Sequence, residues 1–297
     1  MTTEEIQASL SSVASATVEG IDALLHSSFA IALVGALAGA YAGGMAAHRS
    51  MERSKARDEL LREVRSTNAA IILAFTTCNT ALALKKQLVA PMIERFRSER
   101  IAFQEFLAQR RTEQTLRNEN YYIQADFVTF IAPFFPMEAL RDVMYSRVGA
   151  QGKALNLVSQ IDGAVTGLAG AVVERDKVIY SFRTQQPGLN ELPFHYFGVT
   201  DAAGHTHREY ADVLDITESY INDVIWFSAK LCEQLVGHGV KRNELFKERF
   251  GKDALKINEP DFSGPKELGL FPPDSDYSSW SNWMVEEHSE SSDTELV

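Results

Sequence analysis

Three histidines in the second half of the chain are the side chains whose types best suit metal chemistry. The run "HTH" places His205 and His207 two residues apart, His195 precedes them, and Asp201 or Glu209 could add a carboxylate. Imidazole nitrogens and carboxylate oxygens are common ligands of zinc and other transition metals. Histidines at i and i+2 of a helix point in different directions, so a solvated loop is the simpler explanation. We therefore expect no metal, no cofactor and no catalytic residue here, and keep His205, His207 and Asp201 only as candidate ligands.

The rest of the sequence offers no motif for catalysis. "GAQGK" at residues 149–153 superficially resembles a phosphate-binding loop, but Arg147 stands where that loop needs its first glycine and Ala154 where it needs Ser or Thr. The patterns HExxH, CxxC, GxSxG and GxGxxG are absent. Cys78 and Cys232 fall within apolar helical patterns, which indicates buried residues and no disulfide framework.

A glycine-rich stretch carries the information on compartment. "GALAGAYAGG" spans residues 35–44, and no Asp, Glu, Lys or Arg occurs from Ala23 to His48. About 20 apolar residues suffice for a helix to cross the ~30 Å hydrocarbon core of a bilayer. A cleaved signal peptide would begin with a positively charged region, whereas residues 1–26 carry four acidic residues and no Lys or Arg. We therefore predict a transmembrane helix over residues 27–48 and a short extracytoplasmic segment over residues 1–26.

Small residues recur along one face of this predicted helix. Gly35, Gly39 and Gly43 are spaced by four, and the larger Leu37 and Tyr41 are offset from them by two. Two residues correspond to about 200° of rotation, so the small and large residues lie on opposite faces. A row of small residues lets two helix backbones approach closely in a bilayer. The pattern predicts self-association through the three glycines; chance spacing in an alanine-rich helix is the alternative.

A basic belt follows the predicted span. The chain has a net charge of −11, yet residues 49–118 carry fourteen Lys and Arg residues against eight acidic ones. We expect the chain to span the cell (inner or plasma) membrane once. The positive-inside rule then places the N-terminus outside and the bulk of the chain in the cytoplasm. The belt would contact anionic lipid headgroups, and we predict no specific nucleic-acid partner. Its first members are Arg49, Arg53, Lys55, Arg57, Arg62 and Arg65.

Residues 49–258 follow an apolar period close to 3.6, which predicts an all-α cytoplasmic domain, an antiparallel helical bundle. We expect a first helix over residues 54–90 and a second over 91–117, with Pro91 in its first turn. Asn68 falls at an inner position of a heptad-like row, where it could fix the register and oligomeric state of a coiled coil. A helix that faces its own domain's core is the simpler alternative.

Shorter patterns complete the predicted domain. Helices are expected over 137–147, 153–183, 206–236 and 241–250, and the third of them opens with "THRE", in which Thr206 and Glu209 form a capping box. The least helical stretch, "YYIQADFVTFIAPFFP", spans residues 121–136 and contains two prolines, which favours a short strand or a buried connector.

The composition changes after residue 258. Residues 259–297 carry ten acidic residues against one Lys, together with four prolines and many serines, which predicts an acidic disordered tail. Trp280 and Trp283 are unusual in such a tail and are candidates for a docking motif, for folding back on the helices or for contact with the basic belt. A simple tethered tail is the expectation.

These features favour a single-pass membrane-anchored helical protein that acts through oligomerisation or through recruitment of a cytoplasmic protein partner. One alternative is a membrane-tethered hydrolase or metal-dependent enzyme whose site lies near His195, His205 and His207. Another is a membrane-perturbing effector in which assembled glycine-faced helices open a pore.

Overall fold

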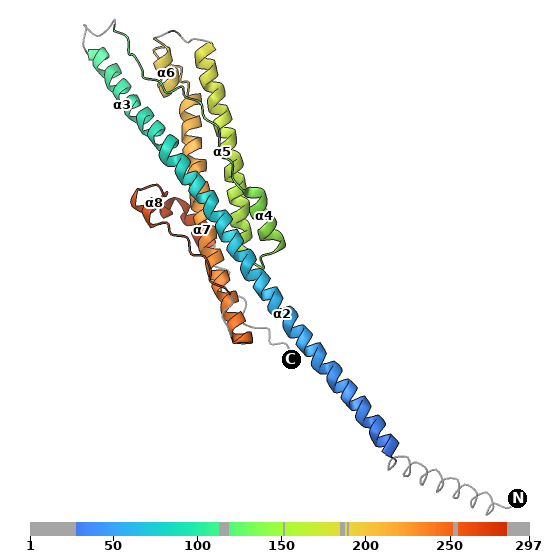
Figure 1. Cartoon of the computed structure of the whole chain (residues 1–297). Coiled ribbons are helices and arrows are strands. Elements are labelled where there is room, and N and C mark those ends of the chain that lie inside the picture. Colours follow the sequence, from blue (N-terminus) through green and yellow to red (C-terminus); the bar gives the residue numbers. More distant parts are fainter. Residues whose placement is uncertain are drawn as a thin grey trace, which may run out of the picture. The chain divides into compact units, whose positions relative to one another are not determined.

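The computed structural model describes residues 28–112, 119–150, 152–184, 188, 190–251 and 255–283, and these residues contain helices and extended segments but no strand (Figure 1). The prediction of an all-helical chain is therefore confirmed for the described part. The helices are α2 (Ser28–Leu84), α3 (Ala90–Thr112), α4 (Met137–Ser146), α5 (Lys153–Thr184), α6 (Leu192–Phe197), α7 (Glu209–Phe250), α8 (Ser263–Glu267) and α9 (Ser278–Trp283).

The chain divides into two compact units, residues 1–60 and residues 61–297. The described part of the first unit is the beginning of α2, whose side chains from Gly35 to Arg57 are almost all exposed. Among the described residues, one helical run has the length and apolar composition needed to cross a membrane, and it contains α2. The predicted extracytoplasmic segment, residues 1–26, lies outside the described residues.

The predicted start of a second helix at Pro91 is confirmed to within one residue, since α3 begins at Ala90 and Pro91 lies in its first turn, but no loop separates α3 from α2. A π-helical turn, Lys85–Val89, joins α2 directly to α3, and the Ala90 N–H donates to the Lys85 carbonyl. A proline has no N–H to donate, and its ring clashes with the carbonyl four residues earlier in a regular α-helix. A wider π turn relieves this conflict by shifting the hydrogen-bond register by one residue. The chain therefore continues as a helix instead of reversing.

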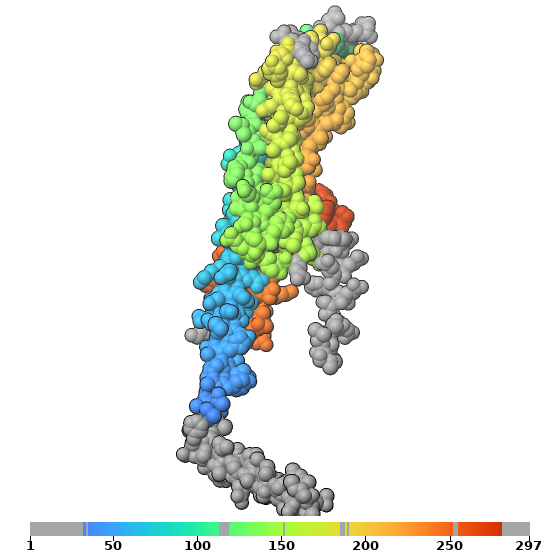
Figure 2. Space-filling view, turned by 90° about the vertical axis from the view of Figure 1, so that its right-hand side faces the viewer, coloured from blue at the N-terminus to red at the C-terminus, as the bar shows by residue number. Residues whose placement is uncertain are grey.

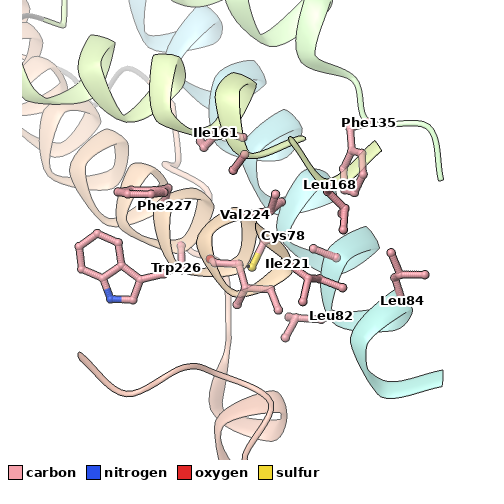
Figure 3. Packing of buried hydrophobic residues seen from close by; sticks show 14 of the residues in the cluster. Cys78, Leu82, Leu84, Phe135, Ile161, Leu168, Ile221, Val224, Trp226 and Phe227 are labelled. Carbon is pink, nitrogen blue, oxygen red and sulfur yellow. Dashed lines mark hydrogen bonds between the residues drawn. The ribbon is translucent and has the colours of Figure 1, made fainter. Parts of the chain in front are cut away.

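One hydrophobic core joins the long helices of the second unit. Helices α5 and α7 lie side by side and run in opposite directions (Figure 1). Gly167 of α5 makes this packing close, because a Cβ added to it would lie 2.4 Å from the ring of Tyr220. Side chains of α2, α5 and α7 interlock around Cys78, Leu168 and Val224, with Phe135 of the connector beside them (Figure 3). Figure 2 shows that α5 and α4 cover one face of this unit.

Helix α7 differs from the prediction at both ends. The expected break before residue 241 does not occur, since Gly237 and Gly239 both lie inside the single helix Glu209–Phe250. Buried contacts outweigh the helix cost of glycine here, and a Cβ on Gly239 would lie 3.0 Å from Ile257. The predicted capping box is also wrong: the helix begins at Glu209, and the Thr206 hydroxyl lies 2.8 Å from the hydroxyl of Thr200.

Residues 119–136 form an extended connector from the end of α3 to α4 (Figure 1). The predicted strand does not form, and the alternative of a buried connector is correct only in part, because several of the side chains are exposed. Along its first half the side chains alternate. Tyr121, Ile123 and Phe127 pack against the core, whereas Tyr122 and Gln124 face outward. Alternation with a period of two is the geometry of an extended chain.

Residues 259–283 fold onto α7, so the expectation of a disordered tail is wrong for this stretch. It contains α8, a 3₁₀ turn (Asp274–Tyr277) and α9, and it buries Phe262 and Tyr277 in the hydrophobic core. Aromatic residues outweigh the acidic and proline-rich composition here, because they supply the apolar area that ordering of the chain requires. Residues 284–297 lie outside the described residues.

Candidate functional site

The glycine row of α2 is an open surface. A Cβ built on Gly35, Gly39 or Gly43 would meet no atom of another segment within 4 Å. The large residues Leu37 and Tyr41, offset from the row by two positions, are exposed as well. Every side chain described between residues 35 and 50 is thus available to lipid or to another helix.

The histidine cluster is brought together only in part. His195 of α6 and His207, just before α7, stack face to face with ring centroids 3.8 Å apart and planes 9° apart. Imidazole lone pairs lie in the ring plane, so two parallel rings do not direct their nitrogens at a common ion. His205 is exposed and lies 3.7 Å from Asp201, whose carboxylate accepts hydrogen bonds from the backbone N–H groups of residues 203 and 205.

Burial and hydrogen bonding shift the pKa values of two side chains in this cluster. Burial, and then the neighbouring His207, lower the pKa of His195 below its ordinary value. Hydrogen bonds from the backbone, that of His205 first, lower the pKa of Asp201. Within the described ranges, no group of three or more His, Cys, Asp or Glu side chains is arranged to hold a metal ion. The cluster is a hydrogen-bonded loop that fixes the entry to α7.

A polar groove at the end of α7 was not anticipated from the sequence. The Oε1 atom of Glu63 lies 3.1 Å from Nε2 of His238 and 2.9 Å from Nε of Arg242. The groove has a volume of about 650 Å³ and is lined by Gly149, where an added Cβ would lie 2.6 Å from the Glu63 carboxylate. The i, i+4 spacing of His238 and Arg242 is the signal that places both on one face of a helix. Charges of both signs share the groove, and its chemistry favours no single ligand class.

Asn68 forms its hydrogen bonds within its own chain. Its side-chain amide donates to the Lys256 carbonyl at 2.9 Å, and its side-chain carbonyl accepts from the Asn258 N–H at 2.9 Å. Both polar groups of the amide thus bind the backbone that leads into the C-terminal segment. The neighbouring Val64 and Ile71 are buried in the core of the same chain. This arrangement corresponds to the alternative of a helix that faces its own domain.

Aromatic residues dock the C-terminal segment on α7. The rings of Trp226 and Tyr277 stack at 4.3 Å, and Trp280 meets Phe227 edge-on at 5.4 Å. Tyr277 also donates to Asp223 at 2.7 Å, and burial raises the pKa of that carboxyl. Trp280 therefore folds back on the helices. The side chain of Trp283 is not among those that the structure describes, so its docking role stays a prediction.

Buried Arg175 holds the connector in place. Only 1% of its surface is exposed, and its guanidinium donates to the carbonyls of Val128 at 2.7 Å and Asp126 at 3.3 Å. Tyr210 donates to the same Asp126 carbonyl at 3.2 Å, and burial raises the pKa of the Tyr210 phenol. Arg183 donates to the next carbonyl, that of Phe127, at 2.6 Å. Three donors from α5 and α7 therefore replace the backbone partners that a sheet would have provided.

Comparison with protein-family models, with curated proteins and with solved structures finds no match to this chain. The described part of the chain presents three features of its own: an exposed glycine row, a docked C-terminal segment and an anchored extended connector.

Proposed function

We propose that the chain is a single-pass membrane protein that acts through self-association and through recruitment of a cytoplasmic protein. The observation that carries the proposal is the exposed apolar start of α2, with its open row of Gly35, Gly39 and Gly43. An isolated exposed helix of this composition would be costly in water, since it packs against no other described segment. In a bilayer the exposed apolar side chains of this helix would contact lipid, and its flat face is suited to packing against a second helix.

The charge distribution supports the proposed orientation. No charged residue occurs from Ala23 to His48, and exposed basic residues begin at Arg49. Under the positive-inside rule residues 49–258 form a cytoplasmic antiparallel helical bundle. The basic belt then lies next to anionic headgroups, where each Lys or Arg contributes about 1 kcal/mol of attraction.

The proposed packing face is tested by exchanging one glycine for a large residue. Gly39→Leu should reduce the oligomer size of the detergent-extracted full-length chain, because the added side chain separates the two backbones. Gly44→Leu is the matched control. It makes the same chemical change on another open glycine, about 140° around the helix from Gly39.

Size-exclusion chromatography with light scattering reads out the mass of each variant. Loss of the oligomer in Gly39→Leu alone supports the glycine face. An oligomer of unchanged mass in both variants would refute it, and so would equal loss in both, which would show that added bulk anywhere on the helix disrupts the oligomer.

A further inference from the structure

The extended connector presents an apolar outer surface that has no partner in the described chain. Four of its side chains are largely exposed: Tyr122 (81%), Val128 (67%), Ile131 (91%) and Phe134 (87%). A scattered exposed apolar residue is ordinary, whereas several on one short segment mark an interaction site. Residues 127–137 include no charged side chain, so nothing on this stretch opposes burial.

The backbone of the connector is bound by side chains and not by another backbone segment. Among the described residues, no backbone–backbone hydrogen bond joins residues 121–134 to another segment. Its inward carbonyls are held by Arg175, Arg183 and Tyr210, which fixes the extended conformation before any partner arrives. Side-chain bonds also hold Val128 N–H and the carbonyls of Phe127 and Val128, so the segment presents its apolar side chains, not a ladder of backbone groups, to a partner.

We propose that residues 127–132, "FVTFIA", pair with the same segment of a second copy of this chain. The choice of a second copy follows from charge: an uncharged surface meets its own copy without repulsion and offers no complementarity to a charged partner. A two-fold axis through the middle of this segment would bring the Thr129 residues of the two copies close together.

The area of the surface suits an interface that needs a tether. The four exposed side chains offer roughly 500 Å² per copy, so that pairing would bury about 1,000 Å² in total. This total is at the lower limit of specific interfaces. The inference therefore rests on the proposed membrane anchor, since joining two copies through one site raises the effective concentration at the other to about the millimolar range.

Two reporter cysteines separate the two contacts in the full-length chain in membranes. Thr129→Cys reports pairing of the connector, and Ala47→Cys, on the row of Gly35, Gly39 and Gly43, reports pairing of the membrane helices. Gln104→Cys on exposed α3 is the control for random collision. The native thiols give little background because both are buried, and burial raises the pKa of Cys232 to about 12.

A short bismaleimide should cross-link Thr129→Cys and Ala47→Cys to dimers, and Gln104→Cys should stay monomeric. Adding Ile131→Lys or Phe134→Lys should abolish the dimer of Thr129→Cys and leave that of Ala47→Cys. Leu268→Lys, the same change on another exposed apolar residue, should leave both.

Dimers through Ala47→Cys alone would overturn this inference and leave the proposed function standing. Dimers of Thr129→Cys that survive the lysine variants, or adducts of Thr129→Cys with another protein, would overturn it as well. Absence of every dimer would overturn the inference together with the self-association proposed above.

Discussion

At the scale of single residues, Arg175 shows how a buried charge can stabilise an irregular segment. Arg175 belongs to α5 and its side chain is buried. Carbonyl dipoles stabilise its charge, and so do the rings of Phe130 and Tyr210, whose centroids lie 5.4 and 5.9 Å from its guanidinium carbon. Carbonyl groups that lose such a donor inside a protein each cost about 1–3 kcal/mol. The connector is thus held by side-chain donors rather than by a sheet.

Arg175→Met should therefore lower the free energy of unfolding by roughly 2 kcal/mol or more, since the Val128 carbonyl loses its donor and the Asp126 carbonyl loses one of its two donors, while the side-chain volume is nearly kept. Urea denaturation followed by circular dichroism measures the change. Lys177→Met, on the exposed side of the same helix, is the control and should change stability by less than about 1 kcal/mol. Equal stability of both variants would contradict the role given to Arg175.

His195 makes stability depend on pH. Its pKa in the folded chain is lowered from 6.5 by burial and by His207, and is raised in part by Glu191, Glu209 and Asp201. As the pH falls below 6.5, the unfolded chain therefore binds a proton before the folded chain does. The contribution of neutral His195 to the free energy of unfolding is therefore present above pH 6.5 and is lost as the pH falls toward the pKa of His195 in the folded chain.

His195→Gln should remove this part of the pH dependence. Urea midpoints at about pH 7.5 and about pH 5.5 should differ less in the variant than in the unsubstituted chain. His205→Gln is the matched control, since the His205 side chain is 72% exposed. A variant in which the two midpoints stay as far apart as in the unsubstituted chain would show that His195 is not the titrating group.

At the scale of elements, the C-terminal segment is predicted to detach as a unit. Tyr277→Ala removes a buried ring that stacks on Trp226 and binds Asp223. Loss of a buried aromatic ring typically costs about 3–5 kcal/mol, and each 1.4 kcal/mol shifts an opening equilibrium about tenfold. The exposed Lys266 within the segment and the exposed Lys256 just before it then become faster tryptic sites.

Limited trypsin digestion followed by mass spectrometry should show cleavage at these lysines accelerated about tenfold or more in Tyr277→Ala. Ser275→Ala, an exposed neighbour, should digest like the unsubstituted chain. Unchanged cleavage in Tyr277→Ala would mean that this ring does not hold the segment.

The elements also show which patterns a sequence discloses. Helical periodicity predicts α4 and α5 almost to the residue, because long amphipathic runs are dictated by burial of one face. Breaks were harder to predict. Pro91 is accommodated by a π turn directly before it, and Gly239 by packing against Ile257, a contact that helical periodicity does not disclose.

The candidate surfaces were predictable to a smaller extent. The glycine row follows from spacing alone, whereas the partners of Asn68 lie about 190 residues further along the chain. Arg175 left a readable signal, because it occupies the inner position between Val172 and Ile179 in the three-four rhythm of α5. A charged residue at such a position predicts a buried partner, although only the structure identifies the carbonyls that it binds.

At the scale of the whole molecule, the proposed function requires that α2 begins inside a bilayer. The glycine face, the orientation and the paired connectors all follow from it, since each requires copies that are held in one membrane. The described part of the chain supplies one helix of sufficient length and apolar composition for this role.

Carbonate-washed membrane fractionation of the full-length chain, combined with protease digestion of intact cells, tests the claim most directly. The account predicts recovery in the membrane pellet, with residues 49–297 protected from external protease until the membrane is opened. Release into the soluble fraction, or digestion of these residues in intact cells, would contradict it.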